Sequence, residues 1–252
     1  MFVDPEAYEA YMGRWSGRLA PLLVDFAGVR DGDAVLDVGC GTGALGSAVF
    51  AAAPRVTLYG IDPSEPFVEF AQRRLPGSRL TVGDAQQLPF PDAAVDRALS
   101  MLVLNFVPDQ ARAVAEMRRV TRPGGVVAAA VWDLDGGMQM IAKFWSIACA
   151  LFPDASQRAE HITPLCSAGE LAALWRRTGF GDVVDRPLEI SCPFTSFDDF
   201  WQPLQRGVGP AGAYVADLDD RRRAELRDAL RTDLGSGPFE LTARAWAASG
   251  VR

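Results

Sequence analysis

The most informative segment of the sequence is Val35-Leu36-Asp37-Val38-Gly39-Cys40-Gly41-Thr42-Gly43. An apolar run ends in three closely spaced glycines, and residues 44–53 then have helical character. A buried strand, a glycine-rich turn and a helix in this order are typical of the start of a βαβ unit. Glycines let a ligand approach the backbone closely, and a helix N-terminus offers free N–H donors. The stretch therefore predicts a ligand site at the end of this strand.

On both sides of this turn, short apolar runs alternate with helical stretches. Strands are predicted at 34–38, 55–60, 79–82, 95–102, 126–132 and 181–188, and helices at 44–53, 64–75, 109–121 and 168–178. A closing strand is predicted at 239–247. This alternation predicts an α/β fold with a doubly wound, mostly parallel sheet.

Two segments interrupt the alternation, at about 134–167 and 191–236. Neither has a linker-like boundary, so the prediction is a single domain over 1–252 with two helical cap insertions. Both are rich in large aromatic side chains, namely Phe144, Trp145, Phe152, Phe194, Phe197, Phe200 and Trp201. These side chains either roof a pocket for an apolar or aromatic small molecule or form the core of the insertions themselves.

Composition narrows the class of partner. The 252 residues include 25 Lys and Arg against 32 Asp and Glu, a net charge of -7. Nucleic acids and anionic membranes bind clustered basic residues, so neither is an expected partner. The four cysteines form no CxxC pair, no signal peptide is evident and no apolar run is long enough to span a bilayer. A cytoplasmic protein with free thiols is therefore expected.

The glycine-rich turn alone leaves the ligand open. Gly41-x-Gly43-x-x-Gly46 also satisfies the dinucleotide fingerprint, and Asp62, at the end of the second strand, suits the ribose of either type of ligand. Two further motifs separate the possibilities. Gly83-Asp84-Ala85 follows the third strand, and Pro123-Gly124-Gly125 precedes the fifth. Both conflict with an NAD-dependent oxidoreductase.

Taken together, these motifs over residues 8–133 resemble the class I S-adenosylmethionine-dependent methyltransferases. The most similar branch is the small-molecule group related to ubiquinone and menaquinone biosynthesis. The resemblance implies a Rossmann-like sheet of seven strands, with 239–247 antiparallel. It also implies methyl transfer from S-adenosyl-L-methionine to a small-molecule acceptor, by in-line displacement in a desolvated pocket. An NAD-dependent oxidoreductase and a non-catalytic cofactor-binding protein remain alternatives.

The resemblance also implies a set of cofactor-binding residues. They are Tyr11, Arg14, Trp15, Asp37, Gly39, Gly41, Gly43, Asp62, Pro63, Asp84, Ala85, Met101 and Leu102. The three glycines are expected to line the methionine part, with Asp37 ordering the loop or reaching the amino group. Asp62, followed by Pro63, is expected to hold the ribose.

The remaining residues of this set surround the other parts of the cofactor. Asp84 and the Ala85 N–H are expected to bind adenine, and residues 101–102 to flank the sulfonium. Tyr11 and Trp15 are four residues apart, hence on one helix face, where they either fold over the cofactor or pack in the core. Arg14 is a candidate partner of the cofactor carboxylate.

No catalytic base and no metal site are assigned. Where many relatives have a histidine, this chain has Asn105, and its one histidine, His161, lies in the first insertion. Asparagine can hydrogen-bond but cannot act as a base at neutral pH. No His/Cys/Asp cluster has the spacing of zinc ligands. We therefore expect positioning of the acceptor, rather than His161 or a metal ion, to provide most of the rate.

Overall fold

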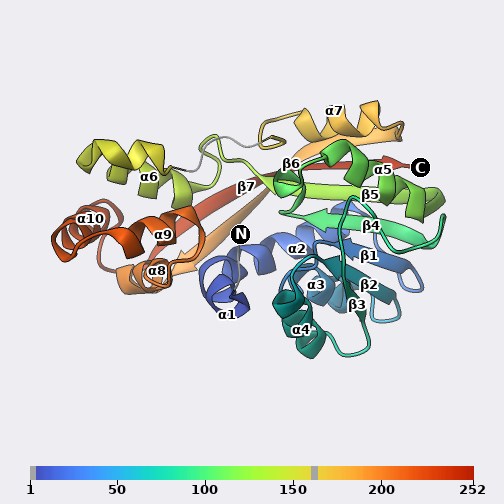
Figure 1. The fold of residues 1–252 in the computed structure, drawn as a ribbon, viewed down its shortest axis with the longest axis horizontal. Helices are drawn as coiled ribbons and strands as arrows, with labels where there is room; N and C mark the ends of the chain where they lie inside the picture. The colour runs from blue at the N-terminus through green and yellow to red at the C-terminus, as the bar shows by residue number, and fades with distance from the viewer. Residues whose placement is uncertain (1–3, 160–163) are drawn as a thin grey trace.

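The computed structural model describes residues 4–159 and 164–252; His161 lies outside these ranges. Within them the chain forms a seven-stranded sheet in the order β3-β2-β1-β4-β5-β7-β6 (Figure 1). The strands are β1 (Ala34–Val38), β2 (Thr57–Asp62), β3 (Arg79–Val82), β4 (Val95–Met101), β5 (Thr121–Trp132), β6 (Gly181–Phe194) and β7 (Phe239–Val251). β1 to β5 pair in parallel, whereas β7 is antiparallel to both β5 and β6. The doubly wound, mostly parallel sheet and its antiparallel closing strand are thus confirmed.

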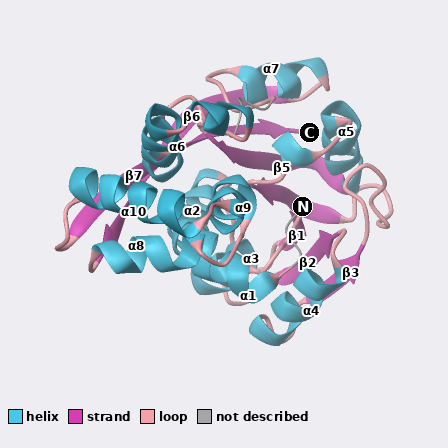
Figure 2. Ribbon diagram, turned by 60° about the vertical axis from the view of Figure 1, so that its left-hand side comes forward, coloured by secondary structure: helices cyan, strands magenta, loops and turns pink. Residues whose placement is uncertain are grey.

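Helices cover both faces of the sheet (Figures 1 and 2). On one face lie α2 (Arg14–Phe26), α3 (Ala44–Ala52) and α4 (Glu65–Arg74), and on the other α5 (Gln110–Val120) and α7 (Glu170–Arg177). Successive side chains of a strand point to opposite faces of the sheet, so each strand packs against the helices on both faces. In β5, Ala128 and Ala130 belong to the core under α2, while Val127 and Val131 belong to the core under α5 and α7.

β6 and β7 extend well beyond the rest of the sheet. β5 pairs with β7 only over residues 245–251, whereas β6 follows β7 as far as the Phe194–Phe239 pair. This projecting ribbon packs with α6 (Gln139–Leu151), α8 (Phe197–Leu204), α9 (Gly209–Asp217) and α10 (Asp220–Leu234) (Figure 1). The strand predicted at 181–188 is wrong at its end, because antiparallel pairing with β7 continues β6 to Phe194.

The bounds of β2, β4, β5 and β7 also differ from the prediction, by one to five residues. β2 ends at Asp62 instead of residue 60, because Ile61 pairs with Val38 of β1 and Asp62 pairs with β3. β5 begins at Thr121, which pairs with Val95, so the Pro-Gly-Gly turn lies inside the strand as a register shift. Pairing between strands, which local sequence does not encode, sets these ends.

The sheet reverses its order between β1 and β4, with β2 and β3 to one side and β5 to the other. At such a switch point the loops after adjacent strands diverge and leave a crevice at their carboxyl ends. The glycine-rich turn follows β1, which places it at that position. Of the helices in 4–159 and 164–252, none has both the length and the apolarity needed to cross a membrane.

Candidate functional site

The turn after β1, residues 39–43, is built by glycines in left-handed conformations. Gly39, Gly41 and Gly43 have φ values of 80°, 49° and 86°. An ideal Cβ on Gly39 would lie 2.4 Å from a methyl group of Val103, so no side chain fits there. At Gly41, by contrast, the nearest atoms to such a Cβ are 4.0 Å away. The turn is therefore pinned at Gly39 and open at Gly41, where a ligand can approach the backbone.

Asp62, at the carboxyl end of β2, is bonded directly to this turn. Its Oδ2 accepts the Gly41 N–H at 3.0 Å, and its Oδ1 accepts the Ser64 N–H at 2.9 Å. Burial raises the pKa of Asp62, and the two N–H groups oppose that rise. Each carboxylate oxygen retains a further lone pair, so the group can also accept hydroxyl hydrogens. Pro63 follows it on the surface.

Asp37, next to it in β1, is a buried carboxylate without a good partner. The residue is 2% exposed, and neither oxygen makes a hydrogen bond of acceptable geometry to any described residue. Burial and the neighbouring Asp62 raise the pKa of Asp37 to about 8, although the N–H of Gly46 acts in the opposite direction. Burying an unpaired carboxylate is unfavourable. A cationic amino group or an ordered water at the turn would satisfy it, which fits the amino end of S-adenosylmethionine.

The N-terminal segment reaches the site through α1 (Pro5–Tyr8), a π-helical turn (Glu9–Gly13) and α2. Tyr11 and Trp15 are both buried, and the Trp15 ring lies 6.1 Å from that of Phe194 at the far end of β6. The Trp15 indole N–H has no hydrogen-bond partner among the described residues. These aromatic side chains thus belong to the core between the sheet and the projecting ribbon.

Arg14, in contrast, is engaged away from the glycine turn. Its Nη2 lies 2.5 Å from Oδ1 of Asp199 in α8, and its guanidinium lies 4.6 Å from the centre of the Phe194 ring. Oδ2 of Asp199 also accepts the Thr195 N–H. The structure therefore joins Arg14 to the β6–α8 corner.

On the other side of the turn, Asp84 follows β3 on the surface. Its carboxylate accepts the Gln86 backbone N–H at 2.8 Å, which together with the Gln86 amide lowers its pKa. Ala85 beside it is half-buried. The Asp84 carboxylate is thus ionised and accessible at this edge of the sheet.

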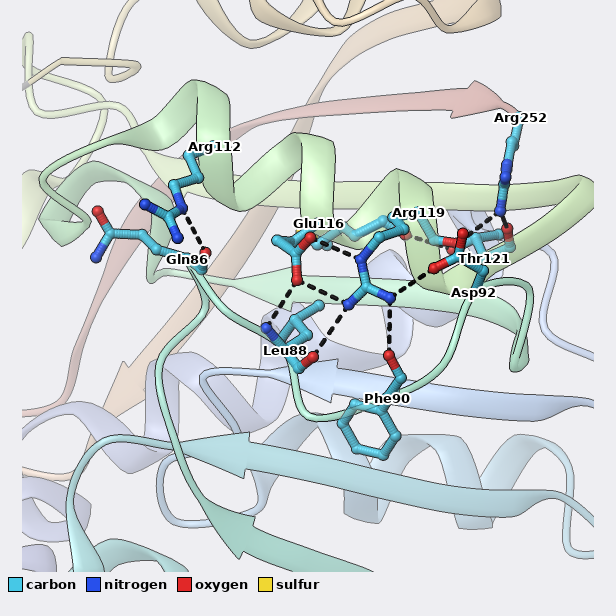
Figure 3. Close-up of polar contacts among 10 residues, drawn as sticks. Gln86, Leu88, Phe90, Asp92, Arg112, Glu116, Arg119, Thr121 and Arg252 are labelled. Atoms are coloured by element: carbon cyan, nitrogen blue, oxygen red, sulfur yellow. Dashed lines mark hydrogen bonds and ion pairs between the residues drawn. The ribbon is translucent and has the colours of Figure 1, made fainter.

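The segment after Asp84 is held against α5 by a network that the sequence analysis missed (Figure 3). Arg119 donates to the carbonyls of Leu88 and Phe90, at 3.0 and 2.8 Å, and Glu116 accepts the Leu88 N–H at 2.9 Å. Glu116 and Arg119 also form an ion pair at 2.7 Å. Their i, i+3 spacing in the sequence indicates that ion pair. It does not indicate that the pair also binds the backbone of residues 86–92.

The carboxyl ends of β4 and β5 meet beside the glycine turn. Met101 is buried, and Leu102 adopts a strained φ of 65° while donating its N–H to the Ala130 carbonyl at 2.7 Å. Trp132, two residues further along β5, is 8% exposed and belongs to the same core as Met101. Its indole N–H has no partner within the part of the chain that the structure describes. Sequence reasoning did not single out Trp132, because an aromatic residue ending a buried strand has no distinctive signal.

The structure thus places Asp37, Asp62 and the glycine turn together at the switch point, with 84–85 and 101–102 on the adjoining strand ends. Among residues 4–159 and 164–252, no three His, Cys, Asp or Glu side chains form a group able to hold a metal ion.

Comparison with known proteins adds a family to this geometry. Residues 36–129 match the family model described as a methyltransferase domain. The chain is 32% identical over 179 residues to demethylmenaquinone methyltransferase of Geobacillus stearothermophilus, a match covering 63% of this chain and 75% of that protein. It is 34% identical over 123 residues to malonyl-[acyl-carrier protein] O-methyltransferase of Serratia marcescens, covering 49% of this chain and 47% of that enzyme. The chain therefore spans about half the length of the Serratia relative.

A solved structure shows the same fold. Phosphoethanolamine N-methyltransferase 2 of Haemonchus contortus, in complex with S-adenosylhomocysteine, superposes with a TM-score of 0.59 at 18% identity, over 98% of this chain and 56% of that one. The sheet order, the glycine turn with its two carboxylates and these sequence matches agree with one another. The chain belongs to the S-adenosylmethionine-dependent methyltransferases.

Proposed function

We propose that this chain transfers the methyl group of S-adenosylmethionine to a small-molecule acceptor. The observation that carries the proposal is the open turn at Gly41, flanked by Asp62, which is bonded to that turn, and by the buried Asp37, whose oxygens make no hydrogen bond of acceptable geometry to a described residue. A cationic amino acid with an attached nucleoside suits this combination, because one carboxylate is left to meet the ammonium group and the other to meet the ribose hydroxyls.

The cofactor lies along the carboxyl ends of β1, β2 and β3 in this proposal. Gly39, Gly41 and Gly43 line its methionine part. Asp37 faces the amino group, and Asp62 with Pro63 holds the ribose. This order follows the strands from the switch point outward.

Adenine and the sulfonium complete the placement. Asp84 accepts from the adenine amino group, the Ala85 N–H donates to the ring, and residues 101–102 flank the sulfonium. Tyr11 and Trp15 close the site from the N-terminal segment. A role for Arg14 at the cofactor carboxylate requires its ion pair with Asp199 to open.

The chain acts on the acceptor by positioning it and excluding water. The sulfonium of the bound cofactor supplies an activated methyl group. Holding an acceptor in line with that group can contribute about 7–11 kcal/mol to catalysis.

We further propose that 1–252 is one methyltransferase domain whose segments 134–167 and 191–236 cap the acceptor side. Support comes from the apolar core, which continues from α2 and β5 into α6, α8, α9 and α10. The aromatic side chains that face this core favour an apolar or aromatic acceptor.

Two measurements test this function. Calorimetry is expected to show micromolar binding of S-adenosylmethionine and S-adenosylhomocysteine, and none of NADH. Incubation with methyl-labelled cofactor and a panel of phenols, quinols and acyl carboxylates is expected to label at least one acceptor, and Asp62→Ala is expected to label it less at limiting cofactor. Binding of NADH in place of the sulfonium cofactor would refute the proposal.

A further inference from the structure

Glu9, in the π-helical turn, contacts the glycine turn from outside the cofactor site. Its Oε1 accepts the Thr42 hydroxyl at 2.5 Å, and its Oε2 lies 3.1 Å from Nη1 of Arg74, at the end of α4. The same Arg74 nitrogen donates to the Thr42 carbonyl at 3.4 Å. Three segments distant in sequence are thereby joined at Thr42, and α1 lies next to α4 in both views (Figures 1 and 2).

Thr42 is well placed to hold the turn. Residues 39–43 contain three glycines and only two residues with side chains, Cys40 and Thr42. The Cys40 side chain packs against Gly60 of β2, and Thr42 is 2% exposed, with its hydroxyl bonded to Glu9. Glycines lose more backbone freedom on ordering than any other residue. A hydrogen bond that fixes Thr42 before a ligand binds reduces the backbone conformational entropy that the turn loses on binding.

Gly13 creates the space that Glu9 occupies. A Cβ on Gly13 would lie 2.8 Å from Oε2 of Glu9, although the backbone φ of -58° suits any residue. Alanine at 13 would therefore favour the helix and yet displace the Glu9 carboxylate from Thr42. At Gly17, one turn further along the chain in α2, such a Cβ would meet no atom of a described residue within 4 Å outside its own stretch of helix, so this position offers a matched control.

We infer that Glu9 is a positioning residue for the cofactor loop: by holding Thr42, it keeps residues 39–43 in the conformation that binds S-adenosylmethionine. The inference rests on the proposed function. It assigns the N-terminal segment a role in cofactor affinity that does not depend on Arg14, whose guanidinium is bonded to Asp199.

Calorimetry with S-adenosylmethionine on alanine variants of the full chain tests the inference. We expect Gly13→Ala and Glu9→Ala each to weaken binding by about tenfold, the size of one hydrogen bond to a charged group. Gly17→Ala, and Glu6→Ala on the exposed side of α1, are expected to bind as the wild type does. In the Glu9→Ala background, Gly13→Ala is expected to have no further effect, because the side chain that it displaces is gone.

A second readout separates loop positioning from general damage. Without cofactor, amide exchange at 41–43 is expected to be faster in Gly13→Ala than in Gly17→Ala, while the melting temperature of Gly13→Ala is not lowered. If the wild type binds the cofactor and both Gly13→Ala and Glu9→Ala bind it with the same affinity, this inference is wrong, whereas the proposed function stands. The inference is also wrong if Gly13→Ala weakens cofactor binding as much in the Glu9→Ala background as it does in the wild type. A wild-type chain that does not bind the cofactor would instead overturn the proposed function.

Discussion

At the scale of single residues, Asp62 combines two tasks. It closes the glycine turn by accepting the Gly41 and Ser64 N–H groups, and we propose that it holds the ribose. Asp62→Ala removes the charged acceptor both from the glycine turn and from the ribose, so we expect cofactor binding to weaken by about 1.5–3 kcal/mol. Calorimetry measures this loss, with the exposed Asp25→Ala as the control for removal of a charge. Wild-type affinity in Asp62→Ala would contradict the assignment.

The buried carboxyl group of Asp37 makes the stability of the fold depend on pH. Burial raises its pKa in the folded chain to about 8, above the ordinary value of 3.8. Between these values the native chain binds a proton that the unfolded chain has lost, so the stability linked to this group falls as pH rises from about 4 through 8.

Asp37→Asn removes this titration. The variant is expected to be more stable than the wild type at pH 8, by about 1–3 kcal/mol, because no buried charge remains unpaired. The difference should vanish near pH 4. Its cofactor affinity should fall, since the amide cannot pair with an ammonium group. Urea denaturation at a series of pH values, beside calorimetry at pH 8, checks both signs; equal pH profiles for the two proteins would argue against the buried carboxylate.

At the scale of elements, one ion pair joins the N-terminal helix to α8. Arg14 and Asp199 retain only 29% and 26% of their side-chain exposure, and the hydrogen bond from Arg14 is the main cause of the lowered pKa of Asp199. A carboxyl group whose pKa is lowered by folding stabilises the fold at pH values above its pKa in the unfolded chain. That stabilisation is lost as the pH falls through its pKa in the folded chain.

Arg14→Gln is therefore expected to lower the unfolding free energy by about 1 kcal/mol at pH 7, and by less below pH 4. Adding Asp199→Asn should cost little more, since the pair is already broken. The exposed Arg55–Asp31 pair is the control, and Arg55→Gln should show no measurable change. Denaturation curves for Arg14→Gln, Asp199→Asn, the double variant and Arg55→Gln measure the coupling; strictly additive losses would mean that the contact contributes nothing.

The N-terminal segment is also expected to respond to the cofactor. Because Glu9 bonds to Thr42, ordering of the glycine turn should be transmitted to residues 8–19. Hydrogen exchange in this segment should slow when S-adenosylmethionine is added. Protection confined to residues 39–43 would show that the segment does not close over the ligand.

For the whole molecule, binding and folding are linked by mass action. S-adenosylmethionine at 100 times its dissociation constant should add about 2.7 kcal/mol to the unfolding free energy. For a chain of this size, that corresponds to a rise in melting temperature of roughly 5–11 °C. NADH should produce no rise, and EDTA should leave both melting temperatures unchanged. Thermal unfolding followed by circular dichroism distinguishes these outcomes, and a shift with NADH alone would favour an oxidoreductase.

Local sequence was sufficient to predict β1, the glycine turn and α3, and the place of that turn in the fold. β1 was predicted with its observed bounds, and α3 ends within one residue of its prediction. Strand, glycine turn and helix are adjacent in the chain, so their preferences act without help from distant residues. Asp62 could be found in the same way, because the carboxyl end of the second strand of a parallel sheet lies beside that turn.

Contacts between distant segments depended on the folded chain. Arg14 meets Asp199 from 185 positions away, and Glu9 meets Thr42 from 33. Nothing near Arg14 distinguishes a carboxylate in α8 from one on a cofactor, since either satisfies a guanidinium. The length of β6 likewise followed from its pairing with β7. Side-chain partners and strand ends are selected by which backbones packing brings together, and that selection takes place in three dimensions.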